Sequence, residues 1–61
     1  MELNDINLAD KIYVFRERVA SIMRKDGASD EFINRELTDS AIKEALKNNF
    51  SAESLAWTLL Q

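Results

Sequence analysis

The first third of the sequence carries an apolar stripe with the period of an α-helix. Its members are separated alternately by four and three residues, and they are Leu8, Ile12, Phe15, Val19 and Ile22. This spacing keeps one face of a helix apolar for about four turns, and Gly27 follows where a helix can end in a left-handed cap. We therefore predict a long helix over residues 8–26, capped by Asn7 and preceded by a short flexible tail at residues 1–6.

The remainder of the chain contains signals for two or three shorter helices. Ser29 stands where it can cap a helix that has two acidic residues in its first turn. Thr38 leaves two alternatives open, because it either caps a further helix or lies inside a helix that continues to Lys47. Ser51 stands as a cap before a last helix at about 52–60, and the asparagines before it tolerate a left-handed turn.

The composition agrees with an all-α fold. The 61 residues include one glycine and no proline, and 46% of them are hydrophobic. We predict a single helical domain, 1–61, built as a small bundle in which the shorter helices pack back on the long N-terminal helix. A chain of this length without disulfides or a metal often completes its core by association, so we expect a homodimer.

The missing residue types restrict the chemistry. The chain has no cysteine and no histidine, which excludes disulfides and thiolate or imidazole metal sites. Two pairs of carboxylates lie close in sequence, Asp30 with Glu31 and Glu36 with Asp39, but so short a chain hardly encloses the pocket that such a pair needs for catalysis. Residues 26–31 fit a helix end followed by a cap better than a calcium loop. We expect no enzymatic activity, cofactor, metal ion or small-molecule substrate.

The sequence also bears on where the protein works. Its beginning lacks the basic and apolar regions of a signal peptide. The longest apolar run, at residues 12–15, is far too short to span a membrane. The absence of cysteine fits a reducing compartment. We therefore expect a cytoplasmic protein that does not associate with membranes.

Charge argues against nucleic acid as the main partner. Eleven acidic residues outnumber eight basic ones, for a net charge of −3, and such a chain repels phosphates unless its cations gather on one surface. The candidate contacts are the basic residues of the long helix, namely Arg16, Arg18, Arg24 and Lys25. We expect these to form a solvated face, balanced on the same helix by Asp10, Glu17 and Asp26.

Residues 42–60 resemble a helix-turn-helix. The resemblance implies that Ala45 packs between two helices, that Asn49 makes the turn, and that Phe50 and Leu55 fill the core behind the second helix. The second helix of such a motif contacts DNA, yet here it contains no arginine or lysine. A nucleic-acid-binding or transcription regulatory protein is therefore an alternative interpretation.

The apolar residues exceed what one short bundle covers, and exposed contiguous apolar surface usually marks a protein contact. The candidate interface residues are Tyr13, Val14, Phe15, Phe50, Trp57 and Leu60. We predict a small interaction module, a regulator or inhibitor that acts by docking on a protein partner. A structural subunit of a larger assembly is a further alternative.

Overall fold

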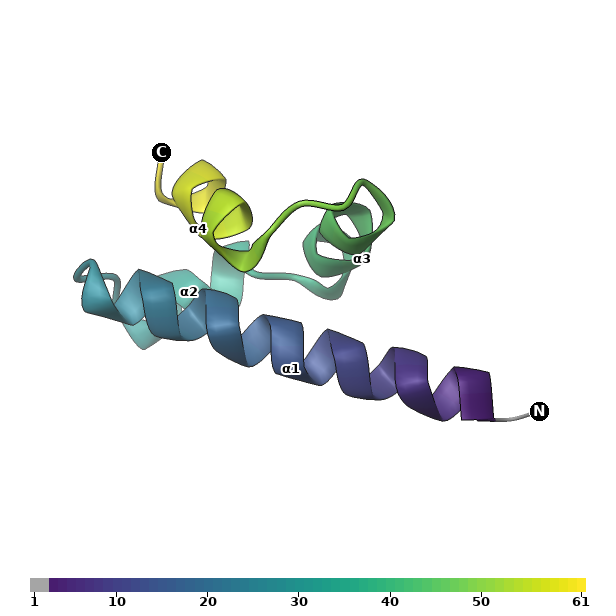
Figure 1. Ribbon diagram of the computed structural model, residues 1–61. Helices are drawn as coiled ribbons and strands as arrows, with labels where there is room; N and C mark the ends of the chain where they lie inside the picture. Colours follow the sequence, from purple (N-terminus) through teal and green to yellow (C-terminus); the bar gives the residue numbers. More distant parts are fainter. Residues whose placement is uncertain (1–2) are drawn as a thin grey trace.

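A computed structural model describes the backbone of residues 3–61 and the side chains of residues 9–61. The described chain forms four helices and no strand: α1 (Leu3–Lys25), α2 (Asp30–Glu36), α3 (Asp39–Lys47) and α4 (Ala52–Leu60). The three shorter helices fold back along α1, and the first turns of α1 extend beyond them (Figure 1). Because α1 packs against all three, and most extensively against α4, the predicted small helical bundle is confirmed.

Helix α1 begins at Leu3, five residues before its predicted start. Asn7 therefore lies within the helix and is not its cap, and the backbone of residues 3–6 is helical. These residues include neither proline nor glycine, so nothing in them interrupts a helix that continues into the packed region. Residues 1 and 2 of the expected tail lie outside the described part of the chain.

A left-handed residue ends α1, as the sequence predicts. Gly27 has a φ of 98°, and its N–H donates to the carbonyl of Arg24 at 2.9 Å. The N–H of Ala28 donates to the carbonyl of Met23 at 3.0 Å. This pair of hydrogen bonds is the Schellman motif, which satisfies carbonyls that the helix end leaves free.

The same motif ends α3, with an asparagine in the place of the glycine. Asn49 has a φ of 60°, and its N–H donates to the carbonyl of Leu46 at 3.3 Å. The N–H of Phe50 donates to the carbonyl of Ala45 at 2.8 Å. The turn reverses the chain and leads directly into α4.

Three hydroxyl side chains cap the shorter helices. The side chains of Ser29, Thr38 and Ser51 each accept a hydrogen bond from the backbone N–H three residues later, at 3.1, 3.2 and 3.1 Å. The caps at Ser29 and Ser51 are as predicted. The structure also decides between the two alternatives for Thr38, because α2 ends before it and α3 begins after it.

The core lies where the C-terminal half of α1 meets the shorter helices. Val19, Met23 and Ile42 are fully buried. The other buried apolar residues are Ala20, Ile33, Leu37, Ala45, Ala52, Leu55 and Ala56. Alanines on both α1 and α4 keep the side chains between these helices small, which favours a short distance between the helix axes.

The predicted stripe on α1 is buried unevenly along its length. Ile12, Phe15 and Ile22 pack against the core but remain partly exposed. The side chain of Leu8 lies outside the described residues.

Among the helices of the described part, none combines the length and the apolar composition that crossing a membrane requires.

Candidate protein-docking surfaces

Four large hydrophobic side chains stay exposed among residues 9–61, whose side chains the structure describes. Their exposed fractions are 62% for Tyr13, 44% for Val14, 47% for Phe50 and 59% for Trp57. Single exposed hydrophobic residues are common on protein surfaces. The question is therefore which of them join other apolar residues to form a continuous surface.

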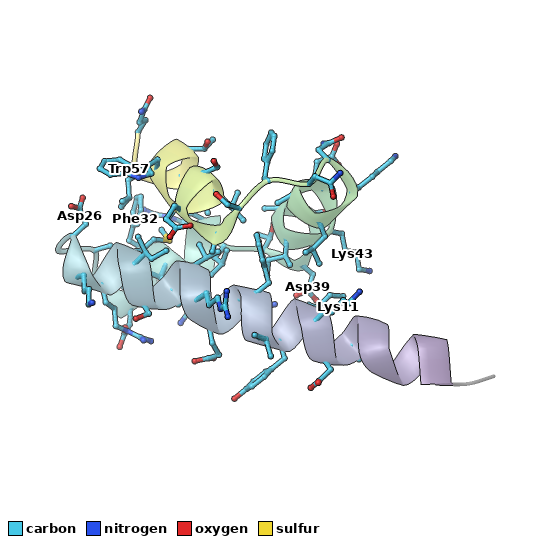
Figure 2. All side chains as sticks on the ribbon, viewed as in Figure 1. Lys11, Asp26, Phe32, Asp39, Lys43 and Trp57 are labelled. Atoms are coloured by element: carbon cyan, nitrogen blue, oxygen red, sulfur yellow. The ribbon has the colours of Figure 1, made fainter. Side chains whose placement is uncertain are left out.

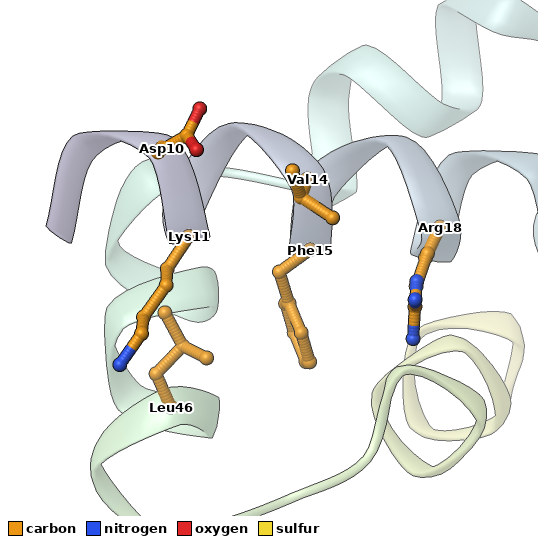
Figure 3. A pocket seen from close by; sticks show the side chains of 6 residues that line it. All are labelled: Asp10, Lys11, Val14, Phe15, Arg18 and Leu46. Atoms are coloured by element: carbon orange, nitrogen blue, oxygen red, sulfur yellow. The ribbon is translucent and has the colours of Figure 1, made fainter. Parts of the chain in front are cut away.

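An apolar hollow lies between α1 and α3. Val14 and Phe15 of α1 and Leu46 of α3 supply its apolar lining. Figure 3 shows Phe15 extending from α1 into the space between α3 and α4, with Leu46 of α3 nearby. A second hollow shares Leu46 and adds Ile12. We call the two together the α1–α3 groove.

Two cations of α1 border the groove. Lys11 lies four residues before Phe15 and Arg18 three residues after it, so all three lie on one side of the helix. Figure 3 shows both basic side chains extending toward the shorter helices, one on each side of Phe15. Asp10 is the one carboxylate among the described residues that line the groove.

Two more cations border the groove from α3. Lys43 and Lys47 line the second hollow together with Leu46, and their spacing of three and four residues places all three on one side of α3. Figure 2 shows Lys43 of α3 extending toward the part of α1 that carries Lys11. Half of the eight basic residues of this acidic chain thus lie at one groove.

A second apolar surface lies at the other end of the bundle. Leu60 of α4 and Phe32 of α2 line a hollow beside the turn that joins α1 to α2. Trp57 precedes Leu60 by three residues on α4, which places the two side chains on neighbouring positions of the helix surface. Figure 2 shows Trp57 projecting outward from α4. We call Phe32, Trp57 and Leu60 the α4 surface.

The candidate interface residues therefore do not form one surface. Val14 and Phe15 belong to the groove, and Trp57 and Leu60 belong to the α4 surface. Tyr13 lines neither hollow, because successive residues of a helix point about 100° apart and Val14 takes the groove side. Phe50 follows the turn after α3 and also lines neither hollow.

Two of the candidate nucleic-acid contacts are engaged by carboxylates. Arg16 forms an ion pair with Asp39 at the start of α3. Nε of Arg24 donates to Oδ1 of Asp30, at the start of α2, at 2.9 Å. This hydrogen bond, together with the charge of Asp30, raises the pKa of Arg24 above its ordinary value. The partners come from other helices, whereas we expected carboxylates of α1 to balance these cations.

The other two candidates lie elsewhere on α1. Arg18 lines the groove, and Lys25 is exposed at the end of the helix. Positions 18 and 25 are seven residues apart and share one side of α1, whereas Arg16 points to another side, toward Asp39. The four candidates consequently do not form the single basic stripe that would suit a phosphate backbone.

The helix-turn-helix resemblance holds at the turn and for two of the expected core residues, but not for Phe50. Ala45 and Leu55 are buried, and Asn49 makes the left-handed turn. Phe50, however, is 47% exposed and does not fill the core behind α4. The reason is that α1, rather than this aromatic ring, covers the inner face of α4.

The hydroxyl groups on the outer side of α4 are engaged within the helix. Oγ of Ser51 donates to Oγ of Ser54 at 3.2 Å, and Oγ1 of Thr58 donates to the backbone carbonyl of Ser54 at 2.9 Å. With these bonds made and no basic residue on α4, this helix offers little for the reading of base edges.

Three of the four carboxylates that lie close in sequence are paired with arginines at the surface. Asp30 and Asp39 are held by arginines of α1, and Glu36 lies 3.7 Å from Nε of Arg35. The segment at 26–31 serves as the end of α1 and the capped start of α2.

No family model matches this chain, and no curated protein or solved structure is significantly similar to it.

Several residues of these surfaces are not among the predicted interface residues, namely Lys11, Ile12, Phe32, Lys43, Leu46 and Lys47. A signal for part of them exists in the sequence. Lys43 is three residues before Leu46 and four before Lys47, a spacing that puts a leucine and two lysines on neighbouring positions of one helix side. The opposite wall of the groove comes from α1, and this depends on how α1 and α3 cross.

Proposed function

We propose that this protein is a small non-enzymatic docking module that regulates or inhibits a protein partner, and that it forms a homodimer. The observation that carries the proposal is the exposure of Trp57 on the α4 surface, beside Leu60. Tryptophan is among the residues that contribute most to binding energy at protein interfaces. A domain this small gains the most from burying it against another protein.

The surface area of the chain is compatible with this proposal. A stable interface takes about 800 Å² from each partner, and the whole chain exposes 4595 Å². One interface would therefore cover roughly a sixth of the molecule. The α4 surface supplies apolar and aromatic residues for the centre of such an interface. Asp26 lines the hollow beside Phe32 and Leu60, and Glu53 lies one helical turn before Trp57, so both can contribute to a polar rim.

Sedimentation equilibrium over a range of protein concentrations tests the proposal. We expect a dimer whose dissociation constant rises by about tenfold or more in Trp57→Ala, since truncation of a central aromatic residue typically costs more than 1.4 kcal/mol. Tyr13→Ala is the matched control, because Tyr13 is equally exposed but lies outside both apolar surfaces. Circular dichroism verifies that both variants fold.

The contrary outcomes are distinct. A wild-type protein that is monomeric at every concentration contradicts the homodimer. A dimer that survives Trp57→Ala but not Tyr13→Ala places the interface on the side of α1 that carries Tyr13.

The two alternatives have less support. Nucleic-acid binding lacks a continuous basic stripe, as described above for Arg16 and Arg18. A structural subunit of a larger assembly would use the same apolar surfaces, so the same variants would detach it from its neighbours. We therefore favour the docking module.

A further inference from the structure

We propose that the α1–α3 groove binds an acidic amphipathic helix of a partner protein. This inference rests on the proposed docking function and adds the chemistry of the partner. It concerns a different surface from the one that contains Trp57, so the two proposals can be tested separately.

The apolar lining of the groove suits one face of a helix. Ile12, Phe15 and Leu46 are partly buried, and Val14 is exposed beside them. An amphipathic helix places apolar side chains at intervals of three and four residues along one face and inserts them into such a groove. The contact would withdraw from water the apolar atoms that the four helices leave uncovered.

The cations around the groove indicate the charge of the occupant. Elsewhere in the described chain, arginines meet carboxylates of the same protein, as Arg16, Arg24 and Arg35 do. The described side chains provide no such ion pair for Lys11, Arg18, Lys43 or Lys47. Carboxylates on the flanks of a bound helix would lie beside these four cations and would also speed association by long-range attraction.

The same arrangement disfavours nucleic acid in the groove. Phosphate groups gain little from the apolar side chains of Phe15 and Leu46, whereas an amphipathic helix uses both the apolar lining and the cations. The chain is acidic outside the groove, so an extended phosphate backbone that continued past it would be repelled. Oligonucleotide binding is therefore an alternative outcome of the test.

The first experiment selects binders from a library of helical peptides displayed on phage. The apolar positions of each peptide are fixed as leucine or alanine, and its polar positions vary among glutamate, lysine and glutamine. We expect selection on the wild-type protein to enrich glutamate on both flanks of the apolar face. Binding of an enriched synthetic peptide, measured by fluorescence anisotropy, should weaken when salt rises from ~0.05 to ~0.5 M.

Two matched double variants locate the binding site. Arg18→Gln with Lys43→Gln removes two cations of the groove, and we expect the peptide affinity to fall by roughly tenfold or more. Lys25→Gln with Arg35→Gln removes the same charge away from the groove and should change the affinity less than about twofold. Circular dichroism confirms the fold of both, and Trp57→Ala should leave peptide binding unchanged.

Each contrary result has its own meaning. Enriched peptides without a preference for glutamate, or equal losses in the two double variants, overturn the assignment of the groove while docking stands. If Trp57→Ala alone abolishes binding, the α4 surface is the site and the groove is not. Absence of any enriched peptide overturns the groove proposal, whereas the docking proposal is decided separately by sedimentation equilibrium. A wild-type dimer that the groove variant dissociates shows a second copy in the groove, and an oligonucleotide that displaces the peptides shows a nucleic-acid site.

Discussion

Gly27 and Asn49 occupy the same place in two equivalent turns, at the ends of α1 and α3. Both have a left-handed backbone, with φ of 98° and 60°, and both are followed two positions later by a serine that caps the next helix. A side chain makes this backbone conformation costly, although asparagine tolerates it better than most residues. The two turns therefore perform the same reversal at different conformational cost.

Replacement of Asn49 by glycine should stabilise the fold. We expect Asn49→Gly to raise the free energy of unfolding by about 0.5–1 kcal/mol, because glycine adopts a positive φ without steric penalty. Urea denaturation followed by circular dichroism measures the effect. Asn48→Gly is the control, since Asn48 has a φ of −96° and glycine there only adds flexibility to the unfolded chain. Equal gains in both variants would contradict the role of the left-handed turn.

Loss of the cap at Thr38 should weaken the separation between α2 and α3. We expect Thr38→Ala to cost about 1 kcal/mol, because the backbone N–H of Ala41 loses its hydrogen-bond acceptor. Ser40→Ala replaces an exposed hydroxyl inside the first turn of α3 and should be neutral or slightly stabilising. Urea denaturation of both variants measures their free energies of unfolding and so tests the role of Thr38 as a cap. Comparable losses would mean that the cap contributes nothing specific.

Two valines on α1 provide a test of where the core lies. Val19 is fully buried, whereas Val14 is 44% exposed. Val19→Ala should cost about 2 kcal/mol through the lost burial of two methyl groups and the cavity they leave. Val14→Ala should change stability by less than about 0.5 kcal/mol, because alanine's higher helix propensity offsets a small loss of contact. Thermal unfolding of both variants at one concentration measures the difference, and similar melting temperatures would contradict this core.

The ion pair between Arg16 and Asp39 should contribute modestly. The two side chains are 37% and 68% exposed, so a double-mutant cycle with Arg16→Gln and Asp39→Asn should give a coupling of about 0.2–1 kcal/mol that decreases with salt. Asp39→Asn alone should cost more than Arg16→Gln alone, because Asp39 also interacts with the N-terminus of α3. The adjacent pair of Arg35 and Glu36, 3.7 Å apart, is a reference cycle, for which we expect almost no coupling.

Much of the local structure follows from residues that are close in sequence. The caps at Ser29 and Ser51 and the turn at Gly27 each use hydrogen bonds between residues at most five positions apart. Such bonds depend on the residue types themselves, so the sequence pattern identifies them before any packing is known. The helical class of the fold follows from the same patterns.

Thr38 shows where local patterns stop being sufficient. A continuous helix and a capped break both satisfy the residues around it, so the sequence leaves both open. In the fold, the break after Glu36 lets Leu37 and Ile42 enter the core together, with exposed fractions of 3% and 0%. In a continuous helix, positions 37 and 42 would point about 140° apart, whereas the break lets both side chains be buried.

The docking surfaces depend on the tertiary structure to a greater degree. The contact of Arg16 with Asp39 and the approach of Leu46 to Phe15 join residues more than twenty positions apart. Helical periodicity shows which face of each helix is apolar but not which helix will cover it. The crossing of α3 over α1 decides that Val14 lines a groove while Tyr13 does not. The buried alanines and isoleucines pack tightly, and tight packing permits only one orientation of these helices. In that orientation, the lysines of α1 and α3 lie around the same groove.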